Sequence, residues 1–178
     1  GLSMIRPAEK KDIPGILAIY NDAILHTTAI YDYTPHTLEQ RTAWFEAHQK
    51  GGWPVFVWEE NGCIAGFAAY GSFRGWPAYK YTIEHSIYVH PDYRRRGIAR
   101  KLMEKLLAAA DEEGYATMVA GIDSANEGSI RLHEQLGFKN AGTIRKAGFK
   151  FGHWLDLVFY QRLLKGPVLP TEGKYSHA

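Results

Sequence analysis

A short basic segment, Arg94 to Gly97, has the composition of an anion-binding loop. It follows a stretch rich in β-branched and aromatic residues, 79–89, which predicts a strand, and it precedes an apolar pattern from Ile98 that predicts an amphipathic helix. The first turn of a helix has backbone N–H groups without intrahelical partners and a partial positive charge. Arginines add full charges, and Gly97 and Ala99 leave room for close approach. The segment therefore predicts a phosphate or pyrophosphate site, with a basic surface turn as the alternative.

A single carboxylate, Glu84, stands in the otherwise apolar strand before this loop. Burying a carboxylate is costly unless the group is paired or has a function. We therefore interpret Glu84 as a general base that acts directly or through a water, with a structural ion pair as the alternative.

Two motifs in order carry a resemblance to a known family. Arg94-x-x-Gly97-x-Ala99 resembles the acetyl-CoA signature of the GCN5-related N-acetyltransferases (GNAT), which reads Gln/Arg-x-x-Gly-x-Gly/Ala. A second block follows at the family's usual separation and reads Asn126-x-x-Ser129-x-x-Leu132-His133-x-x-Leu136-Gly137-Phe138. The resemblance extends from about Ile5 to Leu163.

The chain is most similar to one subgroup of that family, the phosphinothricin and methionine sulfone/sulfoximine acetyltransferases. The segments that carry this similarity are Asn21-Asp22-Ala23, Thr27-Thr28-Ala29, Glu84-His85-Ser86-Ile87-Tyr88-Val89 and Gly148-Phe149-Lys150-Phe151-Gly152-His153-Trp154-Leu155-Asp156. The resemblance implies an enzyme that moves the acetyl group of acetyl-CoA to the amine of a small amino-acid-type acceptor, by direct attack in a ternary complex.

For the cofactor, the resemblance implies that the backbone of the basic loop holds the pyrophosphate and that the strand before it pairs with the pantetheine arm. A backbone N–H of that strand would polarise the thioester oxygen. Two residues of the second block would bond the arm, although Asn126 could equally cap its helix. The residues expected at the cofactor are Ile87, Tyr88, Val89, Arg94, Arg95, Arg96, Gly97, Ile98, Ala99, Arg100, Asn126 and Ser129.

For the acceptor, Arg74 can bind a carboxylate through two hydrogen bonds, and Trp76 beside it can cover an aliphatic stem. The alternative for Arg74 is an exposed loop arginine. The residues expected at the acceptor are Phe73, Arg74, Gly75, Trp76, Glu84, His85 and Ser86.

His133 stands where many members of the family have a tyrosine that protonates the leaving thiolate. It is expected to be catalytic, but the reasoning leaves three roles open: the acid, a contact to the acceptor's acidic group, or packing on a helix face. Tyr88 and other tyrosines near the cleft are alternative acids.

The elements that must position these residues alternate between hairpins and helical crossovers. The expected strands are 4–7, 53–59, 63–70, 79–89, 115–122, 139–146 and 154–163, and the expected helices are 11–21, 37–50, 98–110 and 126–136. This order predicts an α/β (α+β) fold with a mixed, mostly antiparallel sheet and helices on both faces. The resemblance adds a V-shaped splay between central strands. It also makes the irregular segment 21–35 a wall of the acceptor pocket, with a plain helix connection as the alternative.

Composition sets wider bounds. The 178 residues predict one domain, 4–165, with residues 1–3 as a cloning remnant and 166–178 as a loose tail. A net charge of +2 does not indicate nucleic acid, and one cysteine excludes a disulfide framework. No apolar run approaches the roughly 20 residues that span a bilayer, and no secretory signal is visible. We therefore expect a cytoplasmic protein that needs no metal, membrane or nucleic acid.

Other functions remain open at this point. A peptide N-terminus or a polyamine is an alternative acceptor, although a polyamine site needs several acidic residues and the loop 73–81 is basic. A non-catalytic acyl-CoA sensor would keep the basic loop and lose Glu84. The aromatic run from Phe149 to Trp154 is more apolar than a free turn should be. Because the subgroup places this region against the other protomer, a homodimer is expected.

Overall fold

The computed structural model describes residues 2–173, so Gly1 of the expected remnant and residues 174–178 of the expected tail lie outside it. The strands are β1 (Ser3–Pro7), β2 (Val55–Glu60), β3 (Cys63–Ser72), β4 (Thr82–Val89), β5 (Thr117–Asp123), β6 (Lys139–Lys150) and β7 (His153–Leu163), and the helices are α1 (Ile13–His26), α2 (Leu38–Gly51), α3 (Ile98–Glu113) and α4 (Glu127–Gln135). No helix in this described part is long and apolar enough to cross a membrane.

The strands form one mixed sheet in the order β1-β2-β3-β4-β5-β7-β6. The pairing of β4 with β5 is parallel, and the other neighbouring pairs are antiparallel. The expected sheet is confirmed.

The helix caps and the hairpin turn that local sequence patterns predicted are present. The Thr37 hydroxyl accepts from the Gln40 N–H in a capping box that opens α2, and Gly52 ends the helix in the left-handed region at φ 75°. Asn61 and Gly62, at φ 51° and 81°, turn the chain between β2 and β3.

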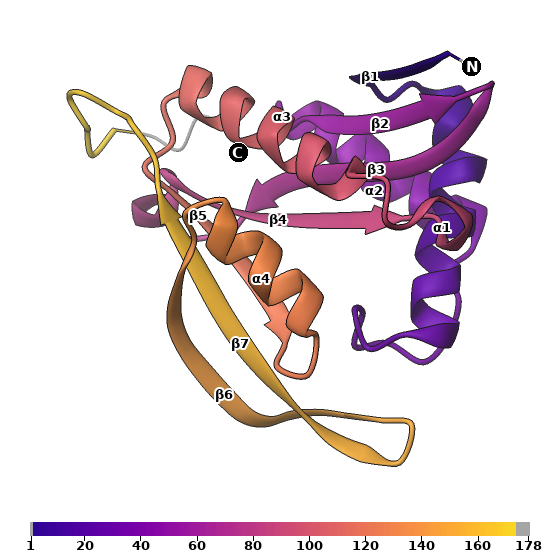
Figure 1. The fold of residues 1–178 in the computed structure, drawn as a ribbon. Helices are drawn as coiled ribbons and strands as arrows, with labels where there is room; N and C mark the ends of the chain where they lie inside the picture. The colour runs from indigo at the N-terminus through magenta and orange to yellow at the C-terminus, as the bar shows by residue number, and fades with distance from the viewer. Residues whose placement is uncertain (1, 174–178) are drawn as a thin grey trace.

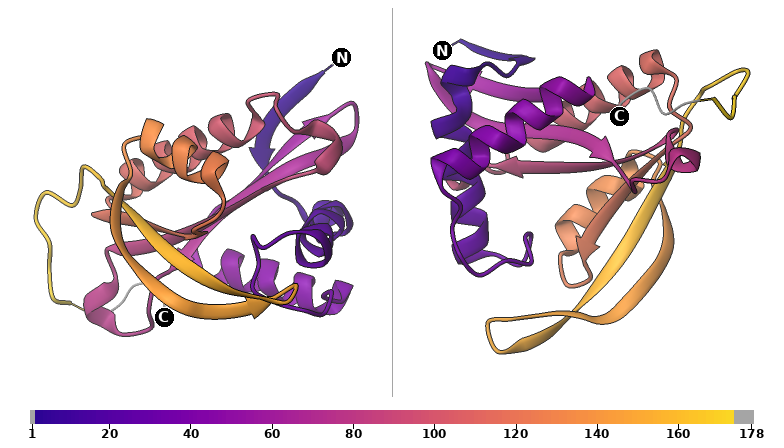
Figure 2. Two further views of the ribbon diagram at one scale, coloured as in Figure 1. Left: turned by 60° about the horizontal axis from the view of Figure 1, so that its bottom comes forward. Right: turned by 180° about the vertical axis from the view of Figure 1, so that it is seen from behind.

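Helices cover both faces of the sheet, as Figures 1 and 2 show. The predicted apolar face of α3, which includes Ile98, Leu102 and Leu106, packs on one face within the larger core. Helices α1 and α2 pack on the opposite face through residues such as Ile16 and Phe45. Each helix buries one apolar stripe against a common sheet, which gives the layered architecture.

The two central strands separate after a short paired segment. Strand β4 pairs with β5 over Thr82, Ile83 and Glu84, but continues to Val89. Figure 1 shows the two arrows diverging from their common start. This confirms the expected splay and leaves the edge of β4 beyond Glu84 open on the β5 side.

Several expected boundaries were wrong because contacts between elements extended or shortened them. Helix α1 continues past residue 21 to His26, since Ala23 and Ile24 are buried against neighbours. Strand β4 begins at Thr82 because 3-10 turns occupy Pro77–Tyr79. The last two strands extend to Lys150 and to His153, so that only two residues form their turn.

Part of the expected tail is attached to the domain. The Thr171 N–H donates to the Tyr81 hydroxyl at 3.0 Å, and the Lys80 ammonium donates to the Gly173 carbonyl at 3.1 Å. The tail up to Gly173 therefore follows the surface near the start of β4.

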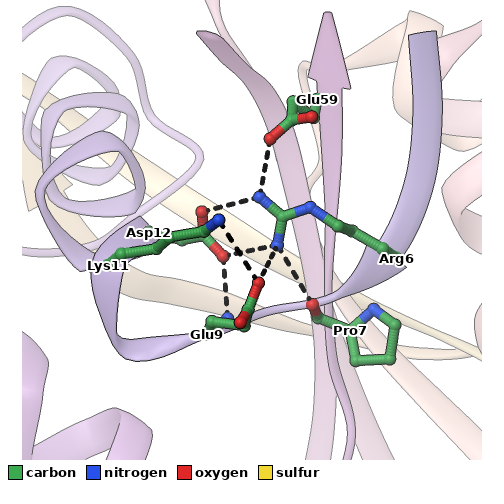
Figure 3. A network of polar contacts seen from close by, with 6 residues as sticks. All are labelled: Arg6, Pro7, Glu9, Lys11, Asp12 and Glu59. Atoms are coloured by element: carbon green, nitrogen blue, oxygen red, sulfur yellow. Dashed lines mark hydrogen bonds and ion pairs between the residues drawn. The ribbon is translucent and has the colours of Figure 1, made fainter. Parts of the chain in front are cut away.

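An ionic network joins β1 to the start of α1 and to β2 (Figure 3). The Arg6 guanidinium donates to both carboxylate oxygens of Asp12, at 2.7 and 2.9 Å, and to Glu59 at 2.8 Å. Burial favours a raised pKa for Asp12, but hydrogen bonds from Arg6 and the Glu9 backbone outweigh it and hold that pKa below its usual value. The network fixes the N-terminal strand as an edge of the sheet.

Candidate active site

A cavity of about 810 Å³ lies between α1 with the segment after it, the open edge of β4, the loop before α3 and the start of α4. Arg94 and Arg95 line it. Arg95 and Gly97 adopt the left-handed region, at φ 64° and 76°, so the chain turns sharply just before α3. The first intrahelical bond of α3 runs from the Lys101 N–H to the Gly97 carbonyl. The N–H groups of the first turn therefore precede the helix ladder and are available to an anion.

The remaining basic side chains of the loop have protein partners. Arg96 forms an ion pair with Glu60 at 2.6 Å and lies over the Tyr93 ring. Arg100 donates to the Gln135 side chain. The Ile98 side chain is buried in the core. The expected contribution of these residues to an anion site is thus limited to their backbone groups.

The open edge of β4 forms one wall of the same cavity through Ile87, Tyr88 and Val89. An extended ligand can pair with such an edge as an added strand does. Asn126 faces the edge from the start of α4, where its side-chain oxygen accepts from the Ser129 N–H at 3.1 Å. The capping role considered for Asn126 is therefore real, and the side chain also borders the cavity.

A second cavity, of about 550 Å³, continues from the first beneath the splay. Ile87, Tyr88 and Asn126 line both. The second cavity brings together most of the residues expected to bind the acceptor or to act in catalysis, namely Phe73, Arg74, Glu84, His85, Ser86 and His133, and Ser129, expected at the cofactor, also lines it. Gly75 and Trp76 do not line this cavity, and Trp76 is 74% exposed, so their contact with the acceptor stays a prediction.

Glu84 lies at the point where β4 and β5 separate. Its Oε2 atom is 3.6 Å from the position that a Cβ on Gly121 would take, so the carboxylate lies close to the β5 backbone at that glycine. Burial raises the pKa of Glu84, and the positive charge of Arg74 partly offsets that effect. A half-buried carboxylate with a raised pKa, facing a cavity, suits a general base.

His85 and His133 form a buried pair beside Glu84. Their Nε2 atoms are 3.1 Å apart, and His133 Nδ1 lies 2.7 Å from the Ser129 carbonyl oxygen. A carbonyl only accepts, so His133 Nδ1 carries the proton, and in the neutral ring Nε2 accepts from His85 Nε2–H. Burial lowers the pKa of both rings, that of His85 to about 3.

Both ring nitrogens of His133 are therefore engaged, and the side chain is only 2% exposed. Of the three roles left open by the sequence, this geometry favours packing and positioning. The role of His133 as an acid stays a prediction.

A second set of contacts was missed by sequence reasoning. Asp123, at the end of β5, is buried and lines both cavities. It accepts from the Thr28 hydroxyl at 2.9 Å and from the Tyr31 hydroxyl at 3.0 Å. These bonds hold the segment after α1 against the cavity, which Thr27, Thr28 and Ala29 line.

Lys150, on β6, holds the other side of that segment. Its ammonium donates to the carbonyl oxygens of Ile24, Thr27 and Ile30 at 2.6, 2.9 and 2.8 Å. The signal available in the sequence was that Thr27 and Thr28 fall in the similar segment 27–29 and Lys150 in the similar segment 148–156, which by itself assigns no contact.

Comparison with known proteins agrees with this geometry. Residues 16–138 match the acetyltransferase (GNAT) family model. The chain is 46% identical to the L-methionine sulfoximine/L-methionine sulfone acetyltransferase of Salmonella typhimurium, over 93% of this chain and 97% of that protein. It is 34% identical to the phosphinothricin N-acetyltransferase of Streptomyces viridochromogenes, over 93% of this chain and 90% of that protein.

A solved structure is similarly close. The acetyltransferase yncA from Salmonella typhimurium, with its cofactor acetyl-CoA, superposes with a TM-score of 0.92 at 44% identity, covering 96% of this chain and 99% of that one. The cradle at α3, the open edge of β4 and these likenesses lead to one conclusion: the chain belongs to the GNAT acetyltransferase family and is an acetyltransferase.

Proposed function

We propose that this chain transfers the acetyl group of acetyl-CoA to the α-amine of a small amino acid. The acceptor class is that of methionine sulfone, methionine sulfoximine and phosphinothricin-like glutamate analogues. The observation that carries the proposal is that Arg74 and Glu84 face one cavity, which is continuous with the anion cradle at α3. A carboxylate holder and a base in one cavity match the two charged ends of an amino acid.

Acetyl-CoA supplies an activated thioester carbonyl, and the residues present fit it. The N-terminus of α3 with Arg94 and Arg95 suits the pyrophosphate, and Asn126 with Ser129 borders the path of the arm. Arg74 orients the acceptor through its carboxylate, away from Glu84, because like charges repel.

Glu84 takes the proton that the amine must lose. Tyr88 lines both cavities, and burial raises its pKa, so its hydroxyl keeps a proton at neutral pH. We propose Tyr88 as the proton donor to the leaving thiolate in preference to His133, whose ring nitrogens are engaged.

The test is thiol release with methionine sulfone, methionine sulfoximine, phosphinothricin, an amidated methionine sulfone, a peptide and spermidine. We expect the free amino acids to be acetylated and the other acceptors to be poor. Glu84→Gln should lower kcat by roughly 100-fold, the usual worth of a positioned base, while acetyl-CoA still binds. Glu112→Gln, on the exposed side of α3, is the matched control. A preference for the peptide or spermidine would overturn the acceptor class.

We also propose that the chain forms a homodimer through the β6–β7 hairpin. The hairpin extends away from the body of the domain (Figures 1 and 2), and Phe149, Phe151 and Trp154 near its turn are about half exposed or more. Phe151 also lines the first cavity, so a partner covering the turn would border the site. Sedimentation should give a dimer for the parent and a monomer for Trp154→Glu. A monomeric parent at micromolar concentration would contradict the proposal.

A further inference from the structure

Glu84 borders a third cavity on the side away from the cofactor. This cavity, of about 430 Å³, is an open groove between α2 and strands β3 and β4. We name it the α2 groove, and define it by Trp44, His48, Trp53, Gly71, Glu84 and Ser86. Glu84 thus stands between the acceptor cavity and a second opening.

His48 is the titratable side chain that α2 contributes to this groove. Its Nδ1 atom is 3.0 Å from the Trp44 carbonyl oxygen, so Nδ1 carries a proton and, in the neutral ring, Nε2 keeps a lone pair. Burial, and then the positive charge of Arg41, lower the pKa of His48. The ring is therefore neutral at pH 7 and able to accept a proton.

A glycine keeps the space between His48 and Glu84 open. Gly71 on β3 pairs directly with Glu84 on β4, and paired residues of antiparallel strands project to the same face, with Cβ atoms about 5 Å apart. His48 Nε2 is 3.4 Å from the position that a Cβ on Gly71 would take. The imidazole therefore stands over the vacant side of Gly71, and Glu84 lines the same groove from the neighbouring strand.

The reaction releases a proton that needs a path. An ammonium and a thioester become an amide, a thiol and one proton. One N–H proton of the amine ends on the thiol sulfur, and another leaves the protein. With acceptor and acetyl-CoA filling the two site cavities, the α2 groove is the opening that Glu84 retains.

We propose that His48 receives, through water in the α2 groove, the proton that Glu84 takes from the amine, and releases it to solvent. This rests on the proposed function. The amine N–H bond breaks as an O–H bond forms on Glu84, and the proton then passes through water to His48 Nε2. The Nδ1–H bond to the Trp44 carbonyl persists in the imidazolium. The titratable or charged groups around His48 are Arg41 on its own helix and Tyr70, Glu84 and His85 along the groove. His48 acts through Glu84 and touches no substrate.

The test compares three variants with the parent, using methionine sulfone and acetyl-CoA in rapid-mixing measurements of the first turnover. His48→Ala removes the imidazole, keeps a strong helix former and leaves room for free imidazole. Gly71→Ala keeps His48 but puts a methyl group in the water path, at ordinary contact distance from its neighbours. Gln49→Ala, on the exposed side of the same helix, is the control.

We expect His48→Ala to lower the first-turnover rate by about tenfold, less than loss of the base itself, with acetyl-CoA affinity unchanged. Added imidazole should restore the rate in proportion to its concentration, and the parent and Gln49→Ala should not respond to it. Gly71→Ala should also be slow, but without rescue.

Three outcomes would overturn the inference: a His48→Ala rate within twofold of the parent, a loss that imidazole does not restore, or a Gly71→Ala variant as fast as the parent. A parent that acetylates none of the amino acids would instead overturn the proposed function.

Discussion

Replacing Lys150 by methionine tests how the segment after α1 is held at the cavity. Lys150 is 4% exposed, and its ammonium donates to the carbonyl oxygens of Ile24, Thr27 and Ile30. The Ile24 carbonyl belongs to the last turn of α1, where carbonyls have no intrahelical partner. Methionine keeps a linear apolar side chain and removes all three bonds.

The expected loss of stability follows from the carbonyl groups that Lys150→Met leaves without a hydrogen-bond donor. The bonds to Ile24 and Ile30 are buried, whereas Thr27 is partly exposed and its carbonyl can turn to water. A stranded buried carbonyl costs about 1–3 kcal/mol. Because methionine also removes the cost of burying an ammonium group, part of this loss of stability is offset. We expect the free energy of unfolding to fall by about 3 kcal/mol.

Urea unfolding followed by circular dichroism measures this loss, and titration calorimetry measures acetyl-CoA affinity. Lys139→Met, at an exposed position on the same strand, is the control and should stay within about 0.5 kcal/mol of the parent. Because Thr27, Thr28 and Ala29 line the first cavity, Lys150→Met should also weaken acetyl-CoA binding. Equal unfolding free energies for the two variants, within about 1 kcal/mol, would refute the reasoning.

Three further changes test the site. Gly97→Glu should bind acetyl-CoA at least about tenfold more weakly than Gly97→Ala. Both substitutions strain the left-handed backbone at this position, but only the glutamate carboxylate repels phosphate. Equal affinities of the two variants by calorimetry would exclude an anion site there. Arg74→Ala should raise KM for methionine sulfone by about tenfold or more and leave KM for acetyl-CoA unchanged, whereas turnover of the amidated acceptor should not depend on the mutation. In the folded protein His85 stays neutral down to about pH 3, whereas in the unfolded chain it gains a proton below about pH 6.5. The free energy of unfolding should therefore decrease as the pH is lowered from 6.5 toward about 3, by up to about 1.4 kcal/mol per pH unit. His85→Gln should flatten that fall in acid-unfolding curves, and an unchanged slope would contradict the assignment.

The sequence by itself determined features that depend on residues close together in the chain. The capping box of Thr37 and Gln40, the turn at Asn61 and Gly62 and the apolar face of α3 all formed as predicted. The basic loop also formed before a helix N-terminus, because glycine geometry and helix polarity are local properties. The order of strands and helices then implied the mixed sheet.

Only the tertiary structure decided where individual side chains of these elements point. The Arg96 side chain pairs with Glu60 at the end of β2, and the Trp76 side chain is exposed to solvent. His133 contacts His85, which lies 48 positions away in the chain, through their Nε2 atoms.

The structure also placed Lys150 against the end of α1, and His48 beside the glycine that pairs with Glu84. These contacts join segments that are far apart in sequence. They depend on how strands twist, separate and pack, so no local pattern in the chain encodes them.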